Sequence, residues 1–149
     1  MSHFYIAYRQ TGPEPGGIAV VDATTGRVRA TRALAGNLGL AARSGGAATK
    51  LYALSEAGQN LSTVDTRTLE TDILYSDHEG SAATDIAVNT DGSRLFLAQG
   101  LSVFELDAAS GKEEEGDHAV PQKPVFSSWA TIALSPDGKR LYLAQESYP

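Results

Sequence analysis

Two groups of neighbouring histidine and acidic residues are the side chains of this chain best suited to chemistry. Asp77, His78 and Glu79 are consecutive, and Asp117 directly precedes His118. Imidazole and carboxylate together can bind a divalent metal or transfer a proton near neutral pH. Neither group has a recognised ligand spacing such as His-Glu-x-x-His, so the simplest interpretation is that both consist of solvated loop residues. The sequence therefore offers candidate residues without defining a metal site.

An aromatic segment rich in proline is the second candidate. Pro121 and Pro124 stiffen the segment that leads to Phe126 and Trp129. The two aromatic side chains could form a flat apolar contact for a ligand or a protein partner. In the alternative interpretation, Trp129 fills space between neighbouring sheets.

Aspartates recur along the chain but are expected to be structural. Asp22, Asp65 and Asp107 each open a similar turn, and Asp91 and Asp137 each precede a glycine. An aspartate at the start of a turn accepts a hydrogen bond from the backbone two residues on. The sequence contains no Ser-His-Asp order, no phosphate-binding glycine loop and no paired buried carboxylates, so it predicts no catalytic residue and no cofactor.

Composition limits the classes of partner. The 149 residues have room for one ordinary domain, and without cysteine there is no disulfide, thiolate metal site or cofactor bound through cysteine. A net charge of −6 argues against nucleic acid or an anionic membrane as a partner. No apolar run approaches the roughly 20 residues of a membrane span. The N-terminus does not resemble a secretion signal, so we expect a cytoplasmic protein, or a periplasmic or secreted one if a signal has been removed.

The elements that position these residues are best seen in the stretch from Asp85 to Gly111. It contains three short apolar runs, at 86–88, 95–98 and 103–106, separated by turn residues. Links this short require neighbouring antiparallel strands. The stretch is therefore one structural unit, a three-stranded meander that ends in an aspartate turn.

The rest of the chain repeats this unit with a period in the forties. Positions of the first, second and third strands recur at steps of 42 to 47 residues, as in the sets Leu40, Ile86, Ile132; Tyr5, Tyr52, Phe96, Tyr142; and Asp22, Asp65, Asp107. Weaker fourth strands are expected at 27–34, 70–75 and 113–120. Four strands per repeat of this length are typical of a β-propeller blade, so the fold class is all-β with blades of four antiparallel strands.

The segment Ala133 to Ala144, ALSPDGKRLYLA, together with Ile18 to Gly26, IAVVDATTG, resembles the YVTN-type β-propeller repeat. The resemblance extends from Phe4 to Gln145. Proteins similar to this repeat include surface-layer repeat proteins, lactonase-like propellers and the heavy subunits of amine dehydrogenases. A shared blade implies the fold and does not transfer chemistry.

The chain is expected to be a single propeller segment, 1–149, that begins and stops part-way through a blade, so the ring of blades is incomplete. We expect a partial blade at 1–36, blades at 38–76 and 84–120, and a partial blade at 130–145, or about three blades where propellers usually have four to eight. The open blade faces need a cover. Either a second copy of the chain or the remaining part of a longer propeller can supply it.

Binding sites on propellers usually lie on the rim that carries the loops between second and third strands and between blades. The candidate residues on this rim, for a protein or small-molecule ligand, are Asp77, His78, Glu79, Asp85, His118, Phe126 and Trp129. The hypothesis favoured by the sequence is a non-catalytic binding or assembly module. The alternatives are a lactonase-like hydrolase with its site at the channel mouth and a propeller subunit of a redox complex.

Overall fold

A computed structural model of the chain describes residues 3–8, 16–34, 39–42, 50–55, 59–76, 82–100, 102–114 and 131–144. Within these ranges the chain forms twelve β-strands and no helix, so the all-β prediction is confirmed. Every strand pair in the four sheets is antiparallel.

The strands form four sheets in chain order. The first sheet contains β1 (His3–Tyr8), β2 (Gly17–Asp22) and β3 (Val28–Ala33), and the second contains β4 (Gly39–Ala42), β5 (Lys50–Ser55), β6 (Asn60–Asp65) and β7 (Thr71–Ser76). The third contains β8 (Ala83–Val88), β9 (Arg94–Gln99) and β10 (Ser102–Asp107), and the fourth contains β11 (Thr131–Leu134) and β12 (Leu141–Ala144). Of the fourth strand expected at 113–120, the described part shows a single bridge between Leu106 and Glu113.

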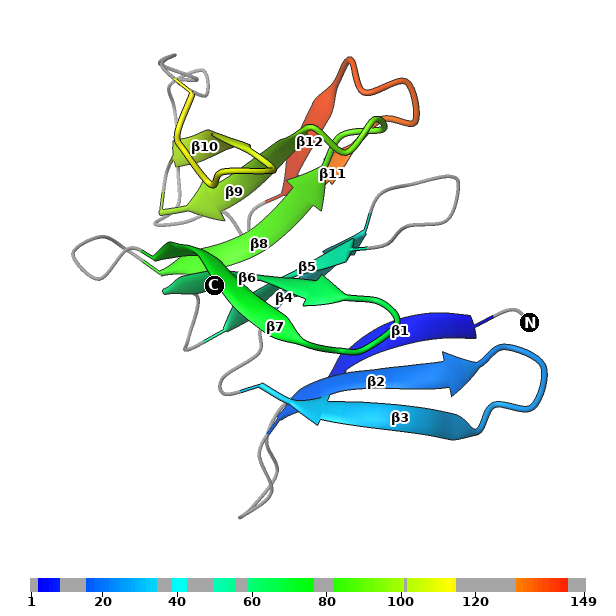
Figure 1. Cartoon of the computed structure of the whole chain (residues 1–149). Helices are drawn as coiled ribbons and strands as arrows, with labels where there is room; N and C mark the ends of the chain where they lie inside the picture. Colours follow the sequence, from blue (N-terminus) through cyan, green and yellow to red (C-terminus); the bar gives the residue numbers. More distant parts are fainter. Residues whose placement is uncertain are drawn as a thin grey trace, which may run out of the picture.

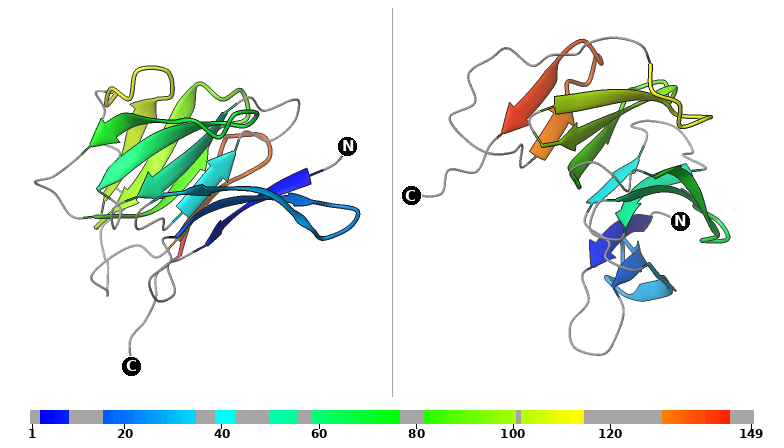
Figure 2. Two further views of the ribbon diagram at one scale, coloured as in Figure 1. Left: turned by 60° about the horizontal axis from the view of Figure 1, so that its bottom comes forward. Right: turned by 90° about the vertical axis from the view of Figure 1, so that its left-hand side faces the viewer.

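The sheets follow one another face to face (Figures 1 and 2), from the first sheet in blue to the fourth in orange and red. Their inner strands are in contact: β1 lies against β4, β4 and β5 lie against β8, and β11 lies against β8 and β9. Each sheet is a meander of sequence neighbours, because the short links allow only antiparallel pairing. This order places each sheet between its predecessor and its successor along the chain.

Aspartate turns join the third and fourth strand positions of the repeats. Asp22 Oδ1 accepts hydrogen bonds from the backbone N–H groups of Thr24 and Thr25, at 2.9 and 2.8 Å. Asp65 and Asp107 accept the equivalent pairs of bonds in their own turns. The predicted structural role of these three aspartates is confirmed, because the carboxylate satisfies N–H groups that have no strand partner.

Each aspartate turn ends on a residue with positive φ. Gly26 has a φ of 68°, Leu69 of 60° and Gly111 of 70°. Glycine adopts this left-handed conformation without a steric penalty, whereas leucine does not. The Leu69 side chain is only 7% exposed and packs between the first and second sheets, which offsets the backbone strain.

The hydrophobic core lies between sheets. The first and second sheets enclose Ile18, Leu51, Ala53, Val64 and Leu69. The second and third enclose the largest cluster, Tyr52, Leu54, Leu61, Ala83, Ile86, Leu95, Leu97, Leu106 and Ala108. The third and fourth enclose Ala87, Ala98 and Ile132. Stability of this arrangement therefore depends on each sheet having a neighbour.

Candidate functional site

Only Asp85 of the seven predicted rim residues lies in the described part of the chain. The other six, Asp77, His78, Glu79, His118, Phe126 and Trp129, lie outside it, as does Asp117. The structure therefore does not describe whether the histidines, acids and aromatic residues come together on the rim, and that site stays a prediction.

Asp85 connects the third sheet to the fourth. It is half-buried on β8, and its Oδ2 accepts a hydrogen bond from the backbone N–H of Ile132 at 2.9 Å and a second, short one from the hydroxyl of Thr131. Its Oδ1 accepts from the backbone N–H of Ile86 at 2.9 Å. Both carboxylate oxygens are thus engaged by donors, which gives Asp85 a positioning role at the start of β11.

Tyrosine hydroxyls form a second connection between sheets that sequence reasoning missed. Tyr5 of the first sheet donates to the carbonyl oxygen of Thr66 in the second at 3.0 Å, and Tyr52 of the second donates to that of Ala108 in the third at 3.4 Å. Thr66 and Ala108 each follow the aspartate of their turn. Burial raises the pKa of Tyr52, with a smaller contribution from the charge of Asp107. The signal was present in the sequence, because the aromatic and aspartate positions repeat together.

The first sheet carries an apolar surface on the side away from the second sheet. The strand register places Phe4, Ile6, Tyr8, Ala19, Val21 and Val28 on one side of this sheet, and we call this surface the N-terminal face. Phe4 is 47% exposed, Ile6 45% and Val28 59%. In the second sheet the positions that match Phe4 and Ile6 are Leu51 and Ala53, and both are buried.

The fourth sheet is exposed on the side that faces away from the third sheet. Ala133, Tyr142 and Ala144 point away from the third sheet, and we call this surface the C-terminal face. Tyr142 is 55% exposed, whereas the matching Tyr52 is 6% exposed beneath the third sheet. The two ends of the described structure therefore expose positions that are covered inside it.

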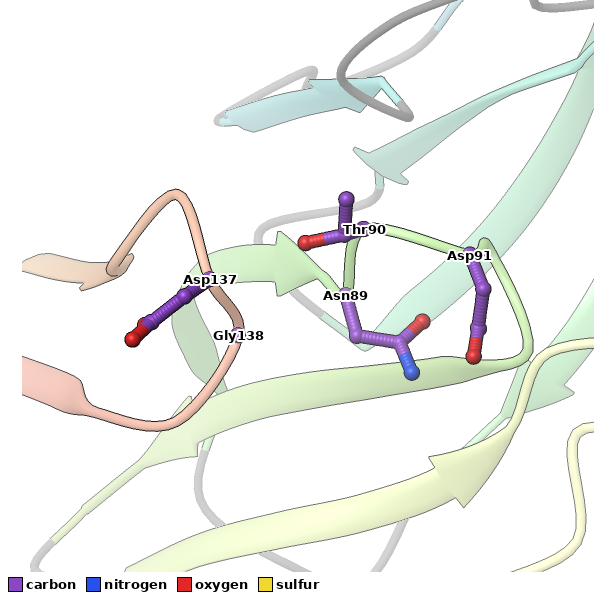
Figure 3. A pocket seen from close by; sticks show the side chains of 5 residues that line it. All are labelled: Asn89, Thr90, Asp91, Asp137 and Gly138. Atoms are coloured by element: carbon purple, nitrogen blue, oxygen red, sulfur yellow. The ribbon is translucent and has the colours of Figure 1, made fainter.

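A hollow of about 440 Å³ lies between two turns of the third and fourth sheets (Figure 3). It is lined by Asn89, Thr90, Asp91, Asp137 and Gly138. These turns join first and second strands, so the hollow lies at the rim opposite to the predicted one. In Figure 3 the Asp137 side chain points away from Asn89 and Asp91.

The carboxylates of this hollow have structural partners. Asp91 accepts from the backbone N–H of Ser93 at 2.8 Å, and Asp137 accepts from that of Lys139 at 3.1 Å. The Ser135 hydroxyl, followed by the Lys139 N–H, lowers the pKa of Asp137. Among the described residues no group of three or more His, Cys, Asp or Glu side chains could hold a metal ion.

A second hollow, of about 290 Å³, lies beside the first and second sheets. Its lining contains the buried polar residues Ser55, Asn60 and Ser62 together with Leu34 and Ile73. The Ser76 hydroxyl donates to Asn60 Oδ1 at 2.6 Å, which fixes the amide. The lining also contains Thr71 and the acidic Asp72 and no cationic side chain, which disfavours an anion there.

The described ranges hold no helix long and apolar enough to cross a membrane. No protein-family model and no curated protein matches the chain.

Solved structures do match it. Hydrazine synthase of Kuenenia stuttgartiensis aligns with a TM-score of 0.66 and 18% identity, over 85% of this chain and 35% of that chain. A gluconolactonase from Xanthomonas campestris aligns with a TM-score of 0.72 and 14% identity, over 91% of this chain and 43% of that one. The chain thus spans less than half the length of either structure. At these identities the likeness shows the fold alone, and with the four antiparallel sheets it shows that this chain is built of β-propeller blades.

Proposed function

We propose that this chain is a non-catalytic β-propeller module for binding and assembly, completed by a second copy or by the rest of a longer propeller. The observation that carries the proposal is the exposure of the N-terminal face. Ile6 is 45% exposed where the matching Ala53 is fully buried, and Phe4 is 47% exposed where Leu51 is 1% exposed. The face is therefore a blade-packing surface to which a further blade can bind.

Energetics support this proposal. Fully burying one large apolar side chain contributes about 1.5–3 kcal/mol, and since Phe4, Ile6 and Val28 are about half exposed, covering each contributes about half as much. Contiguous apolar surface of this kind on a folded protein marks an interaction site. The net charge of −6 favours a protein or small-molecule partner over nucleic acid.

The YVTN-type repeat and the division into blades at 1–36, 38–76, 84–120 and 130–145 belong to the same proposal. In support, the matching positions Tyr52 and Phe96 both lie on the second strand of a sheet and pack against the next sheet. The rim residues Asp77, His78, Glu79, His118, Phe126 and Trp129 are proposed as a ligand-contacting surface above this scaffold.

A lactonase-like hydrolase is the second candidate, and the likeness to a gluconolactonase favours it. Its residues would be Asp77, His78, Glu79, Asp85 and His118. Asp85 would position others rather than bind substrate, because its oxygens already accept bonds from Thr131, Ile132 and Ile86. A third candidate is a subunit of a redox complex, which the likeness to hydrazine synthase favours. This candidate predicts co-purification with a cofactor-bearing protein.

An assay with gluconolactone separates the first two candidates. The chain is incubated with the lactone with and without Ca²⁺, Mn²⁺ or Zn²⁺, and metal uptake is measured by equilibrium dialysis. The assembly module predicts hydrolysis at the rate of buffer alone. Turnover that is lost in His78→Ala but kept in His3→Ala, a change outside the predicted rim, would establish the hydrolase and overturn the proposal.

A further inference from the structure

One contact recurs at two successive sheet boundaries in the same direction. Tyr5 on the second strand position of the first sheet donates to Thr66 in the aspartate turn of the next sheet, and Tyr52 in the second sheet donates to Ala108 in the turn of the third. The preceding sheet supplies the hydroxyl and the following sheet supplies the carbonyl. These two boundaries therefore have a donor side and an acceptor side, whereas at the third boundary the equivalent residue is Phe96, which has no hydroxyl.

The two ends of the described structure carry one unmatched side each. Tyr142 occupies the donor position in the fourth sheet, and its hydroxyl has no hydrogen-bond partner among the described residues. Ala23 follows Asp22 and occupies the acceptor position in the first sheet. It is exposed, whereas Thr66 is half-buried and Ala108 is 4% exposed beneath their preceding sheets.

The glycines of the aspartate turns also differ between a turn covered by a preceding sheet and the uncovered turn of the first sheet. A Cβ placed on Gly111 would collide with the backbone carbonyl of Leu74 in the preceding sheet. A Cβ placed on Gly26 would meet nothing within 4 Å. No sheet precedes the first one in the described structure, so Gly26 lacks the neighbouring outer strand that Gly111 has.

We propose that the N-terminal face and the C-terminal face are the two sides of one further boundary, and that a second copy of the chain supplies it. The fourth sheet of one copy packs on the first sheet of the other, and Tyr142 Oη of one copy donates to the carbonyl oxygen of Ala23 of the other. This inference rests on the proposed assembly function and specifies its partner and geometry.

A second copy fits because each end of the chain is shaped for the other end. All three internal boundaries join a sheet to its successor in the chain, and the two with a tyrosine bond have the donor in the preceding sheet, so continuing the stack places a C-terminal face on an N-terminal face. A head-to-tail contact of this kind forms a ring when its rotation closes. Two copies bring eight sheets, four of them the partial first and fourth sheets, which does not exceed the four to eight blades of closed propellers, and they supply most of the length of the propellers that the chain resembles.

The test measures the mass of the full chain by multi-angle light scattering over a range of concentrations. A closed pair has about twice the 15.7 kDa of one chain and no larger species. Ile6→Glu changes the N-terminal face and Tyr142→Glu changes the C-terminal face, and each variant alone is expected to be monomeric. Val28→Glu and Ala133→Glu are second variants for the same faces, and circular dichroism verifies the fold of each.

Mixing the two variants gives the decisive result. In a head-to-tail pair, the Ile6→Glu chain keeps an intact C-terminal face and the Tyr142→Glu chain keeps an intact N-terminal face, so the mixture regains one intact boundary and the mass of a pair. In a symmetric contact of like faces only one of the two variants would dissociate, and mixing would restore nothing. Tyr142→Phe, which removes only the hydroxyl, should weaken the pair about fivefold per boundary.

Three results would overturn the inference: a monomeric parent chain, a pair that survives both glutamate variants, or an open polymer that grows with concentration. A monomer that does not hydrolyse lactones leaves the proposed function in place, with the rest of a longer propeller as the partner. Lactone turnover overturns the proposed function whatever the mass.

Discussion

The Asp85 carboxylate accepts a hydrogen bond at 2.9 Å from the backbone N–H of Ile132, which lies 47 residues further along the chain. This bond and the one from Thr131 fix the start of β11 against β8. The apolar cluster between these sheets is small, with three buried residues, Ala87, Ala98 and Ile132. Partly buried Phe96, Leu134, Leu141 and Leu143 pack against this cluster, and the carboxylate adds directional bonds that align the third and fourth sheets.

We predict that Asp85→Ala lowers the free energy of unfolding by about 2–4 kcal/mol, because the N–H of Ile132 loses its acceptor together with the Thr131 hydroxyl. Thr131→Val is the matched control, since it removes one donor and keeps the bond to Ile132, and should lose about 1 kcal/mol. Urea unfolding followed by circular dichroism measures both. Equal losses in the two variants would contradict the positioning role.

Acid should destabilise the protein through its aspartate turns. The Arg29 guanidinium holds the pKa of Asp22 well below its ordinary value of 3.8, and the backbone N–H of Thr68 lowers the pKa of Asp65. The Ser110 hydroxyl does the same to the pKa of Asp107. A carboxyl whose pKa is lowered in the folded state stabilises the protein at any pH above its pKa in the unfolded chain. This contribution is lost as the pH falls below about 3.8.

The urea midpoint should therefore be level near neutral pH and fall as the pH drops below about 4. In Asp22→Asn the fall should be shallower, since one of the shifted groups is gone. Arg29→Met, which keeps the backbone donors of the turn and removes the first cause of the shift, should reproduce most of that change. If the urea midpoint falls equally below pH 4 in the parent chain, Asp22→Asn and Arg29→Met, then Asp22 does not cause the loss of stability in acid.

Two glycines with nearly the same φ should respond differently to alanine. Gly26→Ala is expected to cost about 1 kcal/mol from its φ of 68° alone, because a Cβ there has open space around it. Gly111→Ala carries the same backbone penalty and also meets the Leu74 carbonyl, which adds about 1–3 kcal/mol. Urea midpoints of the two variants measure the difference. Similar losses would mean that the third sheet does not approach the second closely at this turn.

Leu69→Gly tests which of two opposing effects is larger. Glycine relieves the strain of a φ of 60°, worth about 1–2 kcal/mol. It also removes a leucine side chain that is 7% exposed between the first and second sheets, and such losses amount to about 2–5 kcal/mol. We expect net destabilisation by about 1–3 kcal/mol in thermal or urea unfolding, and a stabilised variant would contradict the packing assigned to Leu69.

Strand positions could be predicted from the sequence because each repeat alternates short apolar runs with turn residues. The runs around Ile86, Leu97 and Leu106 all lie in observed strands, and the role of Asp22 follows from its own local turn. Such features depend on contacts within about five residues, which the sequence order already fixes.

Contacts between sheets could not be predicted in the same way. The bond from Tyr52 to Ala108 spans 56 residues, and the bonds that engage Asp85 depend on the register of β8 against β11. Asp85 was predicted as a ligand-contacting rim residue because its position in the repeat was known and its partners were not. The aromatic residue of each repeat was assigned to the second strand, but which neighbour it bonds depends on how the sheets stack.

The outermost strand of the first sheet, β3, has all six of its residues exposed and carries Arg29 and Arg32. Arg29 forms an ion pair with the largely buried Asp22, so its charge is held on the strand. A foreign strand that added to this margin would have to desolvate two guanidinium groups, which discourages cross-β growth from it. The charges of β3 thus protect the backbone of this edge from pairing with another strand, and the apolar side chains of the N-terminal face are left as the surface on which a further sheet can pack.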